Sequence, residues 1–169
     1  MTNELIALIA NISLALSFIV AVIFGISQVH VAQRDRRERL TLETLRNFQT
    51  REFAELILWI TTVDLPKNRE QMKTLPAQER NMLVQFAQQM ESIGLLVAEG
   101  IINTDLVDKT LGSLVTTAWE KYKVLFIDMR EKTPDPFLGE YFQWLAERID
   151  ERMKKNPRPP FHETFSRVD

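Results

Sequence analysis

LIALIANISLALSFIVAVIFGISQV, residues 5–29, is an apolar run that contains no charged side chain. A bilayer core about 30 Å thick is crossed by about 20 helical residues, so this run is long enough to span it. The sequence therefore predicts one N-terminal transmembrane helix within residues 1–31. No other run in the chain approaches this length.

A cleaved signal peptide is the alternative interpretation of an N-terminal apolar run. Signal peptides carry a basic segment, an apolar core of about 7–15 residues and a small-x-small cleavage site. Here the run is longer, and no Lys or Arg precedes Arg34. We therefore expect the helix to be retained as an anchor.

Four basic residues follow the run: Arg34, Arg36, Arg37 and Arg39. The side of a span that is richer in Lys and Arg stays in the cytoplasm. This cluster predicts a single-pass protein of the inner (plasma) membrane, with its N-terminus outside and its C-terminal domain cytoplasmic. The first interpretation of the arginine cluster is a stop-transfer anchor, which needs only positive charge beside the span. Binding to anionic lipid is the second interpretation, although Asp35 and Glu38 dilute the cluster.

Small residues recur at every fourth position of the apolar run: Ser13, Ser17, Ala21 and Gly25. Lipid supplies no hydrophobic drive between helices, so small residues favour association by letting two backbones approach closely. Asn11 adds a polar group that could bond across a helix pair. The sequence predicts a packing face for a homo-oligomer, against the alternative that such residues are merely common in membrane helices.

Composition limits the chemistry of the remaining chain. The absence of Cys excludes disulfides and thiolate catalysis. The net charge is −2, and acidic and basic residues interleave without forming the basic face that nucleic acid selects. We expect membrane lipid and a cytoplasmic protein as partners, and no nucleic acid.

Apolar residues recur at helical spacing through residues 32–155, and no window alternates as a half-buried strand would. The predicted fold class is therefore all-α: one N-terminal transmembrane helix, a helical stalk and a compact cytoplasmic bundle of about four helices. The stalk, residues 32–62, continues from the membrane helix. Its inner face is predicted to carry Leu42, Leu45, Phe53, Leu56 and Ile60.

Turn and cap residues predict where the bundle helices begin and end. A polar connection follows Asp64, and Pro76 opens a helix that Gly100 ends as a left-handed C-cap. Residues 103–105 cap the longest helix, which runs to about residue 132. Residues 133–136 end it, with Pro136 as the first residue of the last helix.

Three glycines fall inside these predicted helices: Gly94, Gly112 and Gly139. Glycine within a helix costs up to about 1 kcal/mol relative to alanine. Each of these glycines therefore either allows a close helix crossing or is placed there incidentally. Gly94 lies on the buried stripe of its helix. We expect a close helix crossing there.

The C-terminal segment, residues 156–169, is rich in proline and is predicted to be extended. It has two interpretations. It is a proline-rich ligand for a partner domain, or a tail whose Phe161 and Phe165 pack back on the bundle.

We find no catalytic, metal-binding or cofactor-binding pattern. The two histidines, His30 and His162, are too far apart in sequence to show zinc-ligand spacing, and no glycine-rich phosphate loop occurs. Carboxylates such as Glu91 and Glu140 lie on helices rich in opposite charges, where a solvated face is the simpler interpretation. We expect no enzyme activity and no cofactor.

Several segments together resemble a family of small bacterial single-span membrane proteins whose helical cytoplasmic domain has no known function. They are FAQQMESIGLLVAEGII at 86–102, Trp119-Glu120, Arg130, and FQWLA at 142–146. Such relatives often carry Glu where this chain has Gln143. The resemblance implies a helical fold and membrane association, and no activity. It also singles out Glu91, Trp119 and Arg130 as functional residues or as a buried polar network.

Two classes of function follow. The favoured one is a non-enzymatic, membrane-anchored interaction or scaffold protein. The alternative is a membrane-acting effector, of a defence or toxin-like kind, that assembles through its transmembrane helix. A conducting path is usually lined by ionisable or strongly polar side chains, and the run offers few beyond Asn11, Ser13 and Ser17.

Overall fold

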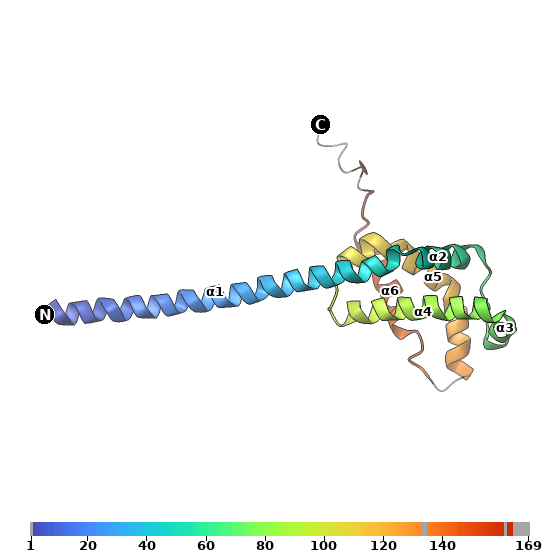
Figure 1. Cartoon of the computed structure of the whole chain (residues 1–169), viewed down its shortest axis with the longest axis horizontal. Coiled ribbons are helices and arrows are strands. Elements are labelled where there is room, and N and C mark those ends of the chain that lie inside the picture. The colour runs from blue at the N-terminus through green and yellow to red at the C-terminus, as the bar shows by residue number, and fades with distance from the viewer. Residues whose placement is uncertain (1, 133–134, 161, 164–169) are drawn as a thin grey trace. The chain divides into compact units, whose positions relative to one another are not determined.

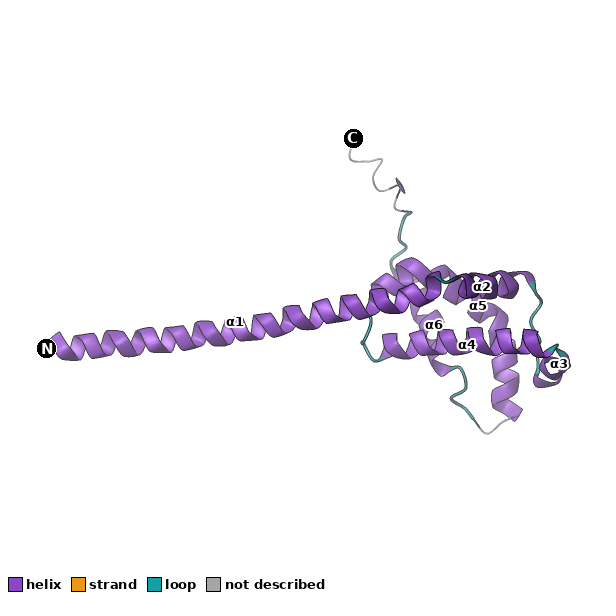
Figure 2. Cartoon of the chain, in the orientation of Figure 1, coloured by secondary structure: helices purple, strands orange, loops and turns teal. Residues whose placement is uncertain are grey.

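The computed structural model describes residues 2–132, 135–160 and 162–163, which form helices joined by short loops (Figures 1 and 2). The helices are α1 (Thr2–Arg46), the 3-10 turn η1 (Asn47–Gln49), α2 (Arg51–Thr62), α3 (Arg69–Thr74), α4 (Ala77–Ala98), α5 (Thr104–Lys132) and α6 (Glu140–Lys155). These described residues contain no strand, which confirms the all-α class. The chain divides into two compact units, Met1–Arg39 and Leu40–Asp169.

The first unit consists of most of α1. Side chains 3–37 are all exposed, including those of the apolar run. Of the described residues, only this helix is both long and apolar enough to cross a membrane. The helix continues past the run to Arg46, as the absence of Gly and Pro in that stretch predicts.

The second unit is a helical bundle in which α6 packs against both α4 and α5, while α2 packs on α4 and α3 on α5 (Figure 1). Each long helix turns one apolar stripe inward, and burying it stabilises the fold by about 25 cal/mol per Å². Side chains fully buried in this core include Phe53, Ile60, Phe86, Met90, Ile93, Tyr122, Leu125, Phe142, Leu145 and Ile149.

The predicted stalk is interrupted. The backbone of Thr50 is extended, and its Oγ1 accepts a hydrogen bond from Phe53 N at 3.2 Å, so Thr50 is the N-cap of α2. Leu45 and Phe53 are buried as predicted, but Leu42 is 56% exposed. The prediction for Leu42 was wrong because the buried stripe of the last turns of α1 runs through Thr41 and Leu45, four residues apart, and Leu42 falls outside it.

The predicted polar connection contains the short helix α3. Asn68 caps it, its side chain accepting from Gln71 N at 2.9 Å. Arg69 N then donates to Asp128 Oδ2 at 2.9 Å. This bond fixes the start of α3 on α5.

The turn between α4 and α5 has the glycine C-cap and the N-cap residue that the sequence predicts. Gly100 is left-handed, with φ 67°. The Asn103 side chain accepts from Asp105 N at 2.9 Å, and Asn103 N donates to Thr41 Oγ1 at 2.8 Å. Thr41 is fully buried, so the last turns of α1 belong to the bundle.

The start of the last helix differs from the prediction. α6 begins at Glu140, and Gly139 precedes it in a left-handed conformation with φ 69°. A Cβ at Gly139 would also lie 2.6 Å from the Phe126 ring. Pro136 is therefore not the first helical residue, because the chain must turn at Gly139 before α6 can begin.

Some predicted features lie outside the described residues. Residues 133–134, predicted to end α5, are among them, as are Phe161 and Phe165 of the tail. Residues 156–160 are described, lie beyond α6 and are exposed.

Candidate functional site

Glu91 projects from α4 to the start of α6. Its Oε2 accepts from Phe142 N at 2.8 Å and its Oε1 from Tyr141 N at 3.3 Å. The first N–H groups of a helix have no partner within the helix, and the positive end of the helix dipole favours a carboxylate. Gly139, the residue before α6, has no side chain with which to cap it. Glu91 supplies the cap from a neighbouring helix.

Arg130, which lies on α5, binds the residues around the start of α6. Its Nε donates to Leu138 O and its Nη1 to Gln143 Oε1, both at 2.7 Å. Within the described part of the chain, its buried Nη2 has no hydrogen-bond partner. Gln143 Nε2 in turn donates to Glu147 Oε1 at 2.8 Å. Arg130 thus ties the turn before α6 to the first turn of that helix.

Trp119 is a core residue with 7% exposure. Its ring centroid lies 5.2 Å from that of Phe142 and 5.8 Å from that of Phe126. Tyr122 belongs to the same aromatic cluster and donates its hydroxyl to Leu83 O at 2.9 Å. Burial raises the pKa of Tyr122 well above its usual value, so this hydroxyl stays a neutral donor.

Glu91, Trp119 and Arg130 therefore converge on the beginning of α6, where Phe142 is the common neighbour of Glu91 and Trp119. Both Glu91 oxygens bind backbone N–H groups of the same chain. Arg130 likewise binds a backbone carbonyl and a neighbouring side chain. Glu91 and Arg130 are half-buried and each bind the start of α6 through separate hydrogen bonds, while Trp119 contributes its ring to the core beneath.

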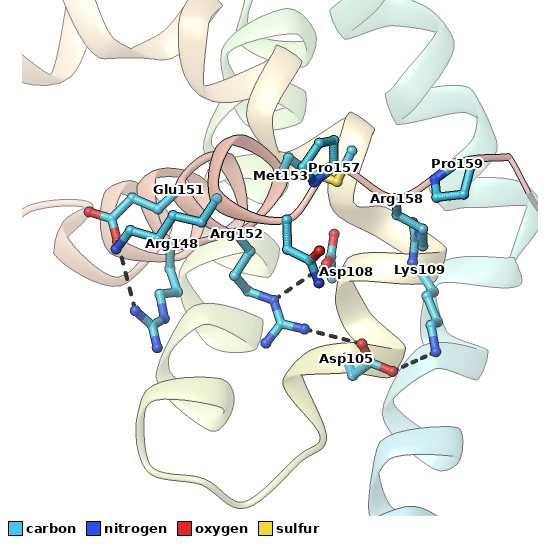
Figure 3. Close-up of a pocket in the computed structure, with 12 residues that line it drawn as sticks. Asp105, Asp108, Lys109, Arg148, Glu151, Arg152, Met153, Pro157, Arg158 and Pro159 are labelled. Atoms are coloured by element: carbon cyan, nitrogen blue, oxygen red, sulfur yellow. Dashed lines mark hydrogen bonds and ion pairs between the residues drawn. The ribbon is translucent and has the colours of Figure 1, made fainter.

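A charged cavity of about 720 Å³ lies between the first turns of α5 and the end of α6 (Figure 3). Arg152 Nη2 is 3.1 Å from Asp105 Oδ1, and its Nε is 3.5 Å from Asp108 Oδ2. Lys109 also pairs with Asp105, at 2.6 Å, and its hydrogen bond holds the pKa of Asp105 below the usual value. Sequence reasoning missed this cluster because Arg152 and Asp105 are 47 positions apart in the sequence.

The charged cavity has the character of an ion-pair network at the surface. Its acidic side chains Asp105 and Asp108 are paired with Arg152, and Glu151 lies 3.8 Å from Arg148 and 3.7 Å from Lys155. In the part of the chain that the structure describes, no group of three or more His, Cys, Asp or Glu side chains could hold a metal ion.

The predicted packing face and basic cluster both lie on α1. Ser13, Ser17, Ala21 and Gly25 are exposed, and a Cβ at Gly25 would meet no atom within 4 Å. In the basic cluster, Arg34 Nε pairs with Glu38 Oε1 at 2.9 Å, one turn along the helix. Solvent screens an exposed pair of this kind, so it contributes little to stability.

Over its described residues the protein is all-helical, with one candidate membrane helix and a bundle braced by polar side chains at the start of α6. The chain belongs to a family described as a domain of unknown function, DUF4760, whose model matches residues 12–149. The match begins within the apolar run and ends in α6. No curated protein and no solved structure matches the chain.

Proposed function

We propose that the protein is a non-enzymatic, membrane-anchored interaction module. Its apolar helix crosses the inner membrane, and its bundle recruits a protein partner on the cytoplasmic side. The observation that carries the proposal is the apolar run of α1, residues 5–29, in which every residue is exposed. Exposed apolar surface on this scale calls for lipid or another chain to cover it. The family match supports a retained helix, because it includes the run from residue 12 onward.

Orientation follows from the basic residues after the run. Arg34, Arg36, Arg37 and Arg39 favour a cytoplasmic location for residues 40–169 by the positive-inside rule. Glu91 and Arg130 hold the start of α6, which favours a structural role over a catalytic one for these two side chains.

Fractionation of cells expressing the full chain tests the anchor. We expect the protein in the membrane pellet after an alkaline wash and its release only by detergent. Introducing Ile19→Arg and Val20→Arg should shift it to the soluble fraction, because each charge at a helix centre costs about 2.5–3.5 kcal/mol in membrane insertion. The control is Leu58→Arg, at a side chain that is 65% exposed on α2. Wild-type protein that is soluble without detergent would overturn the proposal.

Cysteine labelling of intact spheroplasts tests orientation, because the chain has no native Cys. Ser92 is exposed on α4, so we expect Ser92→Cys to react with a membrane-impermeant thiol reagent only after lysis. Thr2→Cys should react in intact spheroplasts. The reverse pattern would contradict the cytoplasmic location of the bundle.

We also propose that the packing face on α1 associates with a second copy. Gly25→Leu should weaken self-association in a membrane two-hybrid assay, because a large side chain separates the two backbones. Ile26→Leu, at the next position, is the matched control and should retain the signal. An equal signal from both variants would contradict the predicted face.

A further inference from the structure

The charged cavity between α5 and α6 is lined by more basic than acidic side chains (Figure 3). The five basic ones come from α5, α6 and the segment that follows α6, and they are Lys109, Arg148, Arg152, Lys155 and Arg158. The three acidic ones are Asp105, Asp108 and Glu151. Five positive and three negative charges leave an excess of two positive charges around the cavity.

Part of this charge is balanced by ion pairs. Arg152 pairs with both Asp105 and Asp108, and Lys109 also pairs with Asp105, so this set of four side chains is neutral. Asp108 is only 8% exposed, and its pairing holds Arg152 against α5. These pairs build one wall of the cavity, and the excess charge lies on the remaining side chains.

The remaining basic side chains are Arg148, Lys155 and Arg158, and Glu151 is the remaining acidic one. Glu151 lies 3.8 Å from Arg148 and 3.7 Å from Lys155. Both distances are longer than a hydrogen bond, so the two basic side chains keep N–H donors for another acceptor. Arg158 is exposed and adds the third positive charge. Three basic groups thus face one carboxylate.

Two prolines hold Arg158 at the cavity. Pro157 and Pro159 flank it in sequence, and both line the cavity with it. Each proline fixes its own φ and restricts the residue before it to an extended backbone, so little further ordering is needed when Arg158 binds a ligand. The hydrogen bond from Lys109 is the main cause of the lowered pKa of Asp105, and the charge of Arg158 adds to it. The Arg158 charge is therefore felt on the α5 side of the cavity.

We propose that the charged cavity binds a phosphate monoester. Such a group carries a charge of about −1.5 to −2 at neutral pH, which matches the excess of two positive charges. Guanidinium groups bind phosphate through parallel N–H bonds, and the ammonium group of a lysine adds a point charge. The cavity volume of about 720 Å³ also lies within the range of about 300–1,000 Å³ that is usual for ligand sites.

Two sources supply a phosphate monoester: a soluble phosphorylated compound and the headgroup of phosphatidic acid. The residues that line the cavity all belong to the bundle unit, so binding of a soluble compound does not depend on the proposed membrane anchor. Binding of the lipid headgroup does rest on that anchor. The experiment therefore has one arm for each source.

A fluorescent label at the cavity tests the proposal. The native chain has no Cys, so Met153→Cys, at an exposed residue of the cavity, takes a single thiol-reactive dye that is sensitive to its surroundings. In the first arm, the full chain in nanodiscs of phosphatidylcholine is titrated with inorganic phosphate at constant ionic strength. In the second arm, phosphatidic acid replaces part of the phosphatidylcholine. We expect the emission of the dye to change in at least one arm.

Two double variants separate the site from the net charge of the protein. Lys155→Gln with Arg158→Gln removes the two excess charges of the cavity, and the response should weaken by about tenfold or more, because charge-assisted hydrogen bonds are lost. The control, Lys67→Gln with Lys73→Gln, removes two exposed charges at α3 and should keep the wild-type response. α3 binds α5 at Asp128, about six turns from the cavity end of that helix.

Each outcome decides the question. A response to inorganic phosphate supports the site with a soluble ligand, and a response to phosphatidic acid alone supports it with a lipid ligand. No response in either arm overturns the proposal, and so does an equal loss in the two double variants, which net charge alone would explain. Protein that fractionates as soluble would contradict the anchor but not the site, because the phosphate titration then runs on the free protein. Lys155 and Arg158 are exposed, so their replacement should leave the thermal unfolding of the bundle unchanged.

Discussion

Replacing Gly94 with alanine should destabilise the bundle by about 3 kcal/mol or more, at the upper end of the usual cost of overpacking. A Cβ at this position would lie 2.2 Å from Tyr141 O and 2.6 Å from Tyr141 C. Both are backbone atoms, so no side-chain rotation relieves the clash and α6 must move away from α4. The same movement would lengthen the hydrogen bonds that Tyr141 N and Phe142 N donate to the Glu91 carboxylate.

Urea unfolding of the detergent-solubilised chain, followed by tryptophan fluorescence, measures this effect. Ser92→Ala is the control, because Ser92 is exposed on the same helix and should change the unfolding free energy by no more than about 0.5 kcal/mol. A Gly94→Ala variant as stable as Ser92→Ala would show that α4 and α6 do not cross as closely as the structure has them.

Replacing Trp119 with alanine should cost about 3–5 kcal/mol, the range for large aromatic residues removed from a core. Total stabilities of about 5–15 kcal/mol are usual, so this loss would remove a large share of the bundle's unfolding free energy. The physical reason is the cavity left beside Phe126 and Phe142, whose rings Trp119 contacts.

Thermal unfolding by circular dichroism distinguishes a structural from a binding role for Trp119. Trp144 is 40% exposed on α6, so Trp144→Ala is a control of the same chemistry and should lower the melting temperature far less. If Trp119→Ala melted at the wild-type temperature, Trp119 would not be a core residue, and a direct role in partner binding would be favoured.

Features that depend on nearby sequence were predictable. Helical spacing placed Leu83, Phe86 and Met90 on the buried stripe of α4, and all three are buried. Gly100 and Asn103 were recognised because cap and turn residues act within a few positions of themselves. The crossing at Gly94 was predicted because an internal glycine on a buried stripe needs a close neighbour.

Features that depend on distant partners were not predictable. Glu91 binds backbone groups 50 and 51 residues away, and no local pattern identifies them. The absence of a side chain at residue 139 is required by the nearby Phe126 ring, which comes from another helix, as well as by the left-handed φ. The break at Thr50 was missed because the apolar spacing on its two sides looked continuous, while the cap depends on one hydroxyl.

The burial of Thr41 and Leu45 determines where the polypeptide can be divided. A fragment that begins with α2 at Arg51 would lose both side chains from the bundle. The part-buried N–H of Asn103 would lose its acceptor, at a cost of about 1–3 kcal/mol, and a hole would replace the Leu45 side chain. Cutting before Leu40 keeps these contacts, since the compact bundle unit starts there. The natural point of dissection therefore lies within α1, about two turns before the helix ends.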